Sequence, residues 1–204
     1  SFQNCMNYYD FSSTKPFLRQ KVRSDLRLLG YSETLDSSEI IAEHLANQAV
    51  FKDEEPCMAL LYSALPLEVD VATIIQSRPS HRYALPRVVP GQSAMECRRF
   101  TSNSDLAPGS YGILEPQPGR SSLINVETID VAVIPGCAFS MSGQRLGQGG
   151  GYYDRLMARP EFRAYAIGIC FECQFFDQLP TEPHDCEVDC VITEAGVRWQ
   201  RLTN

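Results

Sequence analysis

Hydrophobic side chains near the N-terminus recur at helical spacing. On a helix over residues 15–29, one face would carry Leu18, Val22, Leu26 and Leu29. Arginines fall on a strip beside this apolar face, at every fourth position. The pattern therefore predicts an amphipathic helix that packs on a core through its leucines and presents a row of basic side chains next to the contact.

A second helix is predicted shortly afterwards. Gly30 ends the first helix, because glycine commonly occupies the position that follows a helix. Asp36 and Glu39 then have the spacing of a capping box, in which two side chains satisfy free backbone N–H groups at a helix start. We therefore expect the second helix over residues 36–50.

Six later stretches are short and rich in apolar residues, as is typical of strands buried in a parallel sheet. They cover residues 57–63, 82–88, 94–100, 129–135, 163–171 and 186–194. The segments between them predict a short helix at 71–76, a proline-stiffened loop at 105–118, a turn or short helical piece at 175–179, and a strand or short helix at 196–202. Strands that alternate with helices predict an α/β fold, a three-layer αβα sandwich around a mostly parallel sheet.

Composition narrows the class of protein. The chain has 204 residues, of which 44% are hydrophobic and 21% charged, which suits one domain of ordinary size. We expect this domain over residues 15–204, after a flexible tail over 1–14. No apolar run approaches the length of about 18 residues that a membrane span needs. The net charge of −7 argues against general binding to nucleic acid.

The expected location and assembly follow from the same features. The first residues are polar and do not show the basic and then apolar pattern of a secretory signal. We therefore expect a cytoplasmic protein with no membrane partner. We expect it to be a monomer or a weak dimer.

The segment GQRLGQGGGYYDR, residues 143–155, is the most unusual stretch of the chain. Glycine loses much entropy when it is ordered, so a dense run of glycines favours close approach of backbone N–H groups to an anion. An apolar, helix-like segment follows, and a helix N-terminus also favours negative charge. Arg145 adds a forked donor for phosphate, and Asp154 adds the hard oxygen that Mg²⁺ prefers. The stretch therefore predicts a nucleotide-phosphate cradle with a metal ligand beside it.

A plainer interpretation of the same stretch is a flexible turn, with Tyr152 and Tyr153 packed into the core. The stretch lacks the Lys-Ser/Thr ending of a P-loop. It also departs from the dinucleotide fingerprint, because Tyr152 stands where the last glycine would fall. Phosphate binding and a structural turn both stay open on residue chemistry alone.

The eight cysteines raise a second question. Four of them form C-x2-C and C-x3-C pairs with near-zinc spacing, namely Cys170, Cys173, Cys186 and Cys190. The alternative is that they are small buried hydrophobic side chains in the reduced state. Neither pair lies in the glycine- and proline-rich knuckle that zinc usually occupies, so we expect reduced thiols.

The glycine-rich segment resembles the signature RLGxGxGYYDR of the 5-formyltetrahydrofolate cyclo-ligase family, whose members are also called 5,10-methenyltetrahydrofolate synthetases. The resemblance extends over residues 15–195 and includes the segments LPR at 85–87 and YGILEP at 111–116. It implies a fold related to ribose-5-phosphate isomerase and the CoA transferases. It also implies ATP- and Mg²⁺-dependent closure of 5-formyltetrahydrofolate to 5,10-methenyltetrahydrofolate, with release of ADP and phosphate through a phosphorylated formyl intermediate.

The resemblance further implies a set of site residues. The expected catalytic residues are Lys15, Arg19 and Arg145. The expected contacts to ATP are Lys15, Arg19, Arg145, Leu146, Gly147, Gln148, Gly149, Gly150, Gly151, Tyr152 and Tyr153. The expected contacts to the folate are Ser63, Glu68, Tyr111, Gln148, Gly149, Gly150, Gly151 and Tyr152. The expected ligands of Mg²⁺ are Asp154 and Asp189.

Several of these assignments have plainer alternatives. Glu68 could balance a helix dipole, and Tyr111 could pack its loop onto the body. Arg87 lies at a strand exit, where it belongs either to the site or to the ordinary surface. Ser140 departs from the Asp that the family often carries, which predicts a different way of pinning the loop.

Three other functions stay open at this point. The first is a non-catalytic folate or nucleotide sensor on the same fold. The second is a relative of the sugar-phosphate isomerases or CoA transferases that uses the anion site without ATP, since fold alone does not fix function. The third is a zinc-stabilised interaction module.

Overall fold

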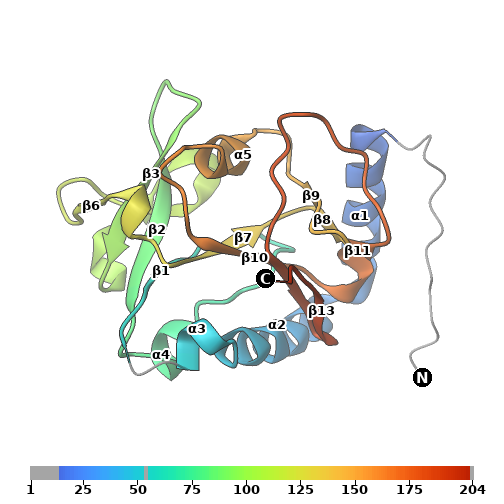
Figure 1. The fold of residues 1–204 in the computed structure, drawn as a ribbon, viewed down its shortest axis with the longest axis horizontal. Coiled ribbons are helices and arrows are strands. Elements are labelled where there is room, and N and C mark those ends of the chain that lie inside the picture. The colour runs from blue at the N-terminus through green and yellow to red at the C-terminus, as the bar shows by residue number, and fades with distance from the viewer. Residues whose placement is uncertain (1–13, 53–54, 203–204) are drawn as a thin grey trace.

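The computed structural model describes residues 14–52 and 55–202, and in them the chain forms an eight-stranded central sheet in the order β13-β12-β10-β7-β1-β2-β3-β6 (Figure 1). Five neighbouring strands are parallel, namely β12 (Cys190–Thr193), β10 (Tyr165–Ile169), β7 (Val131–Pro135), β1 (Met58–Leu60) and β2 (Arg82–Val88). Antiparallel strands continue the sheet on both sides, namely β3 (Met95–Phe100), β6 (Leu123–Ile124) and β13 (Gly196–Gln200). The predicted mostly parallel sheet is therefore confirmed.

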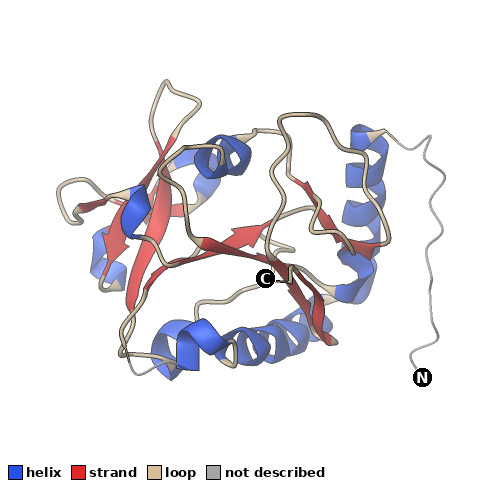
Figure 2. Cartoon of the chain, viewed as in Figure 1, coloured by secondary structure: helices blue, strands red, loops and turns tan. Residues whose placement is uncertain are grey.

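Helices cover both faces of the sheet (Figure 2). Alternate residues of β7 enter two separate cores, with Val131 and Val133 in one and Ala132 and Ile134 in the other. The first core includes side chains of α1 (Lys15–Leu29) and α2 (Tyr31–Ala46). The second includes Leu156 of α5 (Tyr152–Met157). This arrangement has three layers, as expected for strands that are apolar on both faces.

Helix α1 has the predicted bounds. Leu18, Val22 and Leu26 are buried, and Leu29 packs on the same core. The helix ends where Gly30 adopts a φ of 77°, a conformation that side chains with a Cβ rarely adopt. The packing of this leucine face also turns the basic strip of the helix toward the rest of the molecule.

The predicted start of the second helix at Asp36 is wrong. Helix α2 begins at Tyr31, directly after Gly30, so one residue makes the whole turn between two helices. Asp36 and Glu39 lie inside this helix and are exposed, where their spacing is simply that of an outer helix face. The predicted end at residue 50 is also too late, because Ala49–Lys52 forms a separate turn, α3. The predicted helix at 71–76 is the single turn α4 (Ile74–Ser77).

Short pairings account for the other departures. The predicted loop at 105–118 holds a hairpin of β4 (Leu106–Pro108) and β5 (Leu114–Pro116). The segment at 175–179, predicted as a turn or helical piece, contains β11 (Phe175–Phe176). It pairs with β8 (Ala138–Ser140), which in turn pairs with β9 (Arg145–Leu146). Strands of two or three residues are too short to show an alternating pattern of apolar and polar residues. Pairing with strands that are distant in sequence therefore determines where they form. The remaining 3₁₀ turns are η1 (Asn103–Asp105), η2 (Ser110–Gly112), η3 (Val126–Thr128) and η4 (Glu172–Gln174).

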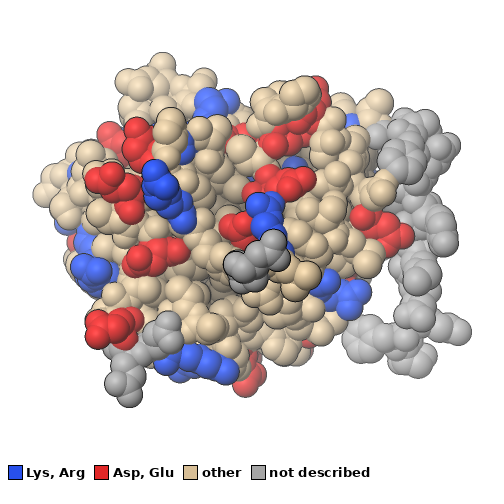
Figure 3. Space-filling model, viewed as in Figure 1, with Lys and Arg blue, Asp and Glu red and all other residues tan. Residues whose placement is uncertain are grey.

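The domain boundary and the fold relationship stay predictions. Of the expected tail over 1–14, all but Thr14 lies outside the described residues. The relation to ribose-5-phosphate isomerase and the CoA transferases also stays a prediction. In the described part of the chain, no helix is both long enough and apolar enough to cross a bilayer. Acidic and basic side chains are interspersed on the face shown in Figure 3, which fits the net charge of −7 better than a broad basic surface would.

Candidate active site

The glycine-rich loop, residues 147–151, connects β9 to α5 near the carboxyl ends of the parallel strands. Open α/β sheets bind ligands at this edge. Gly149 and Gly151 have φ values of 109° and 65°, which explains why glycine stands there. Two hollows meet at this loop, and Gly147, Gly151 and Asp154 line both.

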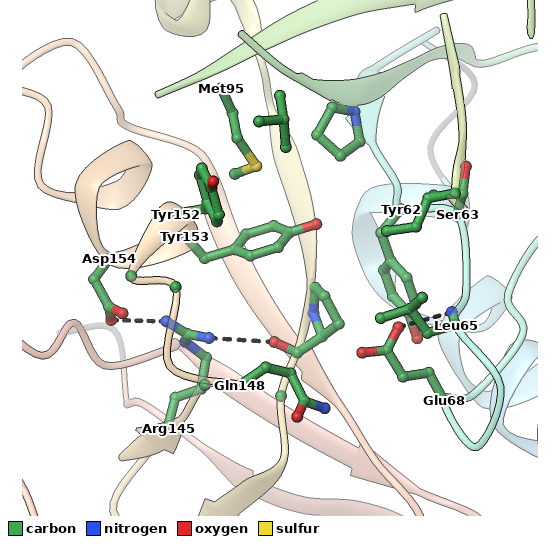
Figure 4. Close-up of a pocket in the computed structure, with 18 of the residues that line it drawn as sticks. Tyr62, Ser63, Leu65, Glu68, Met95, Arg145, Gln148, Tyr152, Tyr153 and Asp154 are labelled. Atoms are coloured by element: carbon green, nitrogen blue, oxygen red, sulfur yellow. Dashed lines mark hydrogen bonds and ion pairs between the residues drawn. The ribbon is translucent and has the colours of Figure 1, made fainter. Parts of the chain in front are cut away.

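The first hollow, the apolar cavity, has a volume of about 290 Å³ (Figure 4). Its walls are mostly apolar or aromatic, and they include Tyr62, Val88, Met95, Ile113, Tyr152 and Tyr153. Polar groups reach it from Ser63 and Glu68 on one side and from Gln148 on the other. Apolar walls with a few placed polar groups are typical of a site for a small organic molecule.

Glu68 is one of three acidic residues that line the apolar cavity, with Glu115 and Asp154. Its Oε2 accepts a hydrogen bond of 3.0 Å from the backbone N–H of Leu65, which fixes the carboxylate against its own loop. Burial raises the pKa of Glu68 above its ordinary value of 4.5, although bonds from Leu65 and the Gln148 side chain oppose that rise. The helix-dipole alternative is unsupported, because Glu68 precedes the turn α4 by six residues and faces the cavity.

Two further residues, Ser63 and Tyr111, are expected at the folate. The hydroxyl of Ser63 donates a 2.8 Å hydrogen bond to the carbonyl of Leu114, so it ties β1 to the β5 segment at the cavity rim. Tyr111 belongs to the turn η2, and its side chain lies outside what the structure describes. Its expected contact with the folate therefore stays a prediction.

The second hollow, the charged cleft, has a volume of about 510 Å³. Lys15 and Arg19 of α1 line it together with the loop, and Glu182, His184 and Asp185 line it from the C-terminal part of the chain. The Lys15 Nζ lies 2.7 Å from Asp185 Oδ2 and 2.5 Å from Glu182 Oε2. Burial by itself would lower the pKa of Lys15, but the bonds to these carboxylates outweigh it and raise the pKa.

Helix α1 also contacts the loop itself. The Nε of Arg19 donates a 2.8 Å hydrogen bond to the carbonyl of Gly147. One turn further along, the Nη2 of Arg23 donates to the side-chain oxygen of Gln148 at 3.2 Å. The basic strip predicted beside the leucines therefore faces the glycine-rich loop, which places Lys15 and Arg19 beside it as expected.

Arg145 is the most enclosed charged group of the site, with 5% of its surface exposed. Its Nη2 lies 2.7 Å from Asp154 Oδ1, its Nη1 donates to the Pro135 carbonyl at 3.4 Å, and its guanidinium lies 5.8 Å from the centre of the Tyr153 ring. Its Nε is buried and has no hydrogen-bond partner among the described residues. A buried guanidinium with a spare N–H beside a backbone loop suits an anionic ligand.

The two expected magnesium ligands are not brought together. Asp154 faces the charged cleft, where its Oδ1 also accepts a 3.3 Å hydrogen bond from the Cys186 N–H. Asp189 lines a different hollow. It stands just before β12, at the amino edge of that strand, and its Oδ2 accepts a 3.0 Å hydrogen bond from the Ala166 N–H. Its Oδ1 lies 3.5 Å from Arg201.

The fit of Mg²⁺ therefore differs between the two aspartates. A magnesium ion that arrives with ATP needs only one or two carboxylates besides the phosphates, and Asp154 is placed to supply one. Both aspartates are engaged by a backbone N–H and an arginine, so what separates them is position, since Asp189 lines the other hollow. The side chains of Glu182, His184 and Asp185 also cluster in the cleft, but the Lys15 ammonium contacts both of these carboxylates.

Arg87 does not line either hollow at the glycine-rich loop. Pro86 and Val88 on either side of it line the apolar cavity, so the alternation of the strand turns Arg87 to the opposite face. There its Nη1 lies 3.8 Å from Glu96. Arg87 therefore lines neither hollow and is partly buried beside Glu96, so a role for it in the site stays a prediction.

Ser140 pins the turn before Arg145. Its buried hydroxyl accepts hydrogen bonds from the N–H groups of Ser142 and Gln144, at 3.3 and 3.2 Å. The Gln144 side chain continues the network to the N–H of Leu179 at 2.9 Å. A serine therefore satisfies these backbone donors in the place where an aspartate was expected.

The cysteines do not gather around one point. Cys170 belongs to the core on one face of the sheet and Cys190 to the core on the other. Cys186 lines the same hollow as Asp189, and its thiol contacts the Asp154 carbonyl at 3.5 Å. Burial raises the pKa of the Cys190 thiol to about 11, as for a buried neutral side chain. This placement opposes a single zinc site built from both pairs.

Sequence reasoning missed four residues of the site. Glu182 and Asp185 pair with Lys15 across a separation that no local pattern spans, and Arg23 and Arg155 contact the loop only because of the fold. The regular spacing of Lys15, Arg19 and Arg23 on one helix face was the single signal that could have pointed to Arg23.

These features define an α/β protein with a mostly apolar cavity and a charged cleft that meet at a glycine-rich loop. The model of the 5-formyltetrahydrofolate cyclo-ligase family matches residues 11–194. The chain therefore belongs to the 5-formyltetrahydrofolate cyclo-ligase family, a family of ligases.

Named relatives agree with this family. The mitochondrial 5-formyltetrahydrofolate cyclo-ligase of Arabidopsis thaliana is 28% identical, over 90% of this chain and 75% of its own length. The mouse 5-formyltetrahydrofolate cyclo-ligase is 27% identical, over 90% of this chain and 95% of its own. The solved structure of Aquifex aeolicus 5,10-methenyltetrahydrofolate synthetase has a TM-score of 0.79 and 32% identity, and the match covers 93% of both chains. The corresponding synthetase from Mycoplasma pneumoniae, at 22% identity and a TM-score of 0.69, shows the shared fold.

Proposed function

We propose that this protein catalyses the ATP- and Mg²⁺-dependent cyclisation of 5-formyltetrahydrofolate to 5,10-methenyltetrahydrofolate, with release of ADP and phosphate. Membership of the family and the names of its relatives support the reaction. The observation that carries the proposal is that one glycine-rich loop forms a wall of both the apolar cavity and the charged cleft. A folate ring system and a polyphosphate would thus meet at the same few atoms.

The chemistry requires such a meeting point. The formyl oxygen is a poor leaving group, so the γ-phosphoryl of ATP is first transferred to it and ADP is formed. The N10 amine then attacks the formyl carbon, a C–N bond forms, the N10 proton is lost and phosphate departs with the oxygen. Phosphoryl transfer depends mainly on positioning and on stabilising charge. No covalent nucleophile on the protein is needed, which fits the burial of Cys57, Cys97, Cys137, Cys170 and Cys190.

The charged cleft holds the polyphosphate in this proposal. Lys15 and Arg19 supply cations from the cleft wall, and Arg145 adds one from the apolar cavity beside Asp154, which lines both hollows. The N–H groups of residues 146–153 supply further donors. The buried Nε of Arg145 has no hydrogen-bond partner among the described residues, so in this proposal it donates to the bound phosphate. Bound Mg²⁺ would screen the phosphate charge, and Asp154 would hold it. Asp189 is left out of this role, because it lines a different hollow from Asp154.

The apolar cavity holds the folate. Tyr152 and Tyr153 provide flat apolar surface, and Glu68 is placed to accept hydrogen bonds from N–H groups of the ring system. Ser63 lies at the rim, and Tyr111 is expected to join from the turn η2. Gln148 faces the same cavity, so the loop contacts both substrates.

The first test is an absorbance assay in the methenyl-folate band, with 5-formyltetrahydrofolate and Mg²⁺, with and without ATP. We expect a rise that requires both ATP and the protein and that is lost in Asp154→Ala. Folate binding without any rise would indicate a sensor instead. Neither a rise nor folate binding would mean that the loop serves another phosphate ligand.

Two further statements complete the proposal. The protein acts in the cytoplasm, and it works as a monomer or a weak dimer without nucleic acid or membrane. Size-exclusion chromatography with light scattering at several concentrations would check the assembly, and a tight dimer at all of them would contradict it.

A further inference from the structure

Arg155 connects the glycine-rich loop and the start of α5 to a turn that is distant in the chain. Its Nη2 donates a 2.6 Å hydrogen bond to the carbonyl of Gly150 in the glycine-rich loop. Its Nε donates to the carbonyl of Ser93, in the turn at residues 89–94 between β2 and β3. Its guanidinium also lies over the Tyr152 ring, 5.2 Å from the ring centre. One exposed side chain therefore joins the loop to the wall of the apolar cavity.

The bond to Gly150 fixes the direction of a peptide group. In a trans peptide the C=O and the following N–H point in opposite directions. With the Gly150 carbonyl turned to Arg155, the N–H of Gly151 is turned away from Arg155. Gly151 lines both the apolar cavity and the charged cleft, so this N–H belongs to a residue that the two hollows share.

A second arginine acts in the same way at the other end of the loop. Arg19 holds the carbonyl of Gly147, which turns the N–H of Gln148 away from Arg19. Glycines have many accessible conformations, so a run of them needs outside contacts to keep its N–H groups in one arrangement. Guanidinium groups at Gly147 and Gly150 supply such contacts on two sides of the loop.

Arg155 also packs closely against the loop. A Cβ placed on Gly151 would come within 2.7 Å of the Arg155 Nη1, so glycine at this position makes room for the guanidinium. The same guanidinium reaches Ser93, which lies two residues before the cavity-lining Met95. A single planar group therefore contacts both the loop and the turn next to the cavity-lining Met95.

We propose that Arg155 is a positioning residue that presets the glycine-rich loop for the nucleotide and couples the loop to the cavity wall. This inference rests on the proposed function. Arg155 lines neither hollow, so it acts through the loop and not on the reacting atoms. Its removal should weaken ATP binding and should reduce the extent to which bound folate favours ATP.

Arg159, just beyond the end of α5, provides a matched control. It follows Arg155 by four residues, and its Nη2 donates a 2.7 Å hydrogen bond to the carbonyl of Met95. It therefore anchors the β2–β3 region as Arg155 does, but its hydrogen bond goes to β3 and not to the glycine-rich loop. A purely structural role would make the two arginines equivalent in the assay.

The test compares Arg155→Ala, Arg155→Lys and Arg159→Ala with the wild type. The measurements are kcat, the KM for ATP at low and at saturating folate, the KM for folate, and the Kd for a non-hydrolysable ATP analogue. For Arg155→Ala we expect the KM for ATP and the Kd for the analogue to rise by about 10-fold or more. We also expect folate to have little or no effect on the ATP affinity of Arg155→Ala. Arg155→Lys should fall in between, because an ammonium cannot reproduce the planar fork that serves two carbonyls.

Arg159→Ala should leave the KM for ATP within about twofold, since a contact that does not touch the loop contributes little to it. Equal changes in the two alanine variants, or an unchanged analogue affinity in Arg155→Ala, would overturn the inference. Thermal unfolding identifies a variant that fails to fold, and the comparison of Arg155→Lys with Arg159→Lys then decides in the same way.

The outcome for the wild type separates this inference from the proposed function. A wild type that forms no methenyl-folate but binds the ATP analogue contradicts the proposed reaction, while analogue affinities still decide the role of Arg155. A wild type that binds no analogue overturns both.

Discussion

The two hollows at the glycine-rich loop are built in opposite ways. The apolar cavity is walled by side chains that need no partner, such as Val88, Met95 and Ile113. The charged cleft is lined by groups that already have partners, because Lys15 pairs with Glu182 and Asp185. The first can receive a ring system largely as it stands. The second can receive a polyanion only if its existing ion pairs rearrange.

This difference has an energetic meaning. Apolar walls gain from contact in proportion to the area they bury. Paired charges gain only the difference between the new partner and the old one. Arg145 is the exception in this region, since one of its N–H groups is buried and still lacks a partner among the described residues. We therefore expect affinity for the folate to depend on shape, and affinity for ATP to depend on a few exchangeable charges.

The largest effect is expected from Arg145→Ala. The change removes a buried cation at the border of the two hollows and leaves Asp154 without its 2.7 Å partner. We expect kcat/KM to fall by about 10²- to 10³-fold and the free energy of unfolding to fall by about 3 kcal/mol. Steady-state kinetics and chemical denaturation would measure the two effects.

Arg201→Ala is a suitable control for that change, because Arg201 is more exposed and pairs with Glu187 away from the loop. It should cost about 0.5 kcal/mol or less and leave kcat/KM nearly unchanged. An active Arg145→Ala variant would show that the charged cleft does not bind the transferred phosphoryl group.

The next effect concerns the two aspartates. Asp154→Asn should raise the Mg²⁺ concentration for half-maximal activity and lower kcat on the order of 10²-fold, because the carboxylate at the cleft is lost. Asp189→Asn should leave the magnesium dependence within about twofold and lower stability by about 1 kcal/mol, through its contacts to Ala166 and Arg201. Magnesium titrations of both variants would check this, and equal shifts would restore Asp189 as a ligand.

A smaller, pH-dependent effect is expected at Glu68. Its pKa is raised above 4.5 by burial, so the carboxylate gains a proton in the folded protein at a higher pH than in the unfolded chain. If the charged form accepts folate N–H groups, folate affinity falls as the pH drops through this raised pKa. Glu68→Gln should raise the folate KM by about 10-fold and remove this acid limb.

Glu68→Gln is expected to raise the stability of the protein, although it weakens folate binding. A raised carboxyl pKa contributes stability that is present below pH 4.5 and is lost as the pH rises through the folded-state value. At neutral pH the buried charge is therefore unfavourable, and Glu68→Gln should unfold at a higher temperature than the wild type. Glu161→Gln, at an exposed glutamate, should change neither quantity. An unchanged acid limb in Glu68→Gln would remove Glu68 from the folate site.

The smallest effect is expected from Ser63→Ala. The change deletes a single neutral hydrogen bond from Ser63 to the Leu114 carbonyl at the rim of the apolar cavity. Stability should fall by about 1 kcal/mol, and the folate KM should rise by less than about threefold. A large rise would indicate that the hydroxyl contacts the substrate directly.

Regular, strongly patterned elements were predictable from the sequence. The bounds of α1 and β2 agree with their predicted ranges, because a four-residue apolar repeat and a long apolar run each admit one arrangement. The start of α2 was wrong because Gly30 alone separates two helices, while Asp36 and Glu39 fit an outer helix face equally well. Strands β8, β9 and β11 were missed, since their pairing is set by distant partners.

The site likewise has features that the sequence pattern predicted and features that it did not. The loop at residues 147–151 and the basic face of α1 were visible as local patterns, and the structure brings them together through Arg19 and Gly147. The partners of Lys15 and the separation of Asp154 from Asp189 depend on how the chain ends are placed, which local spacing does not encode. Resemblance supplied residue roles, but not the distances between them.

The ion pair between Lys15 and Asp185 can form only late in the synthesis of the chain. These residues are 170 positions apart, which corresponds to roughly 10 to 30 s of protein synthesis at typical rates. During that interval the leucine face of α1 lacks its cover, because Phe171 and Phe176 of the same core have not yet been made. The emerging helix is thus a natural target for chaperones, and shortening the chain from its C-terminus would remove both the cover of α1 and the partner of Lys15.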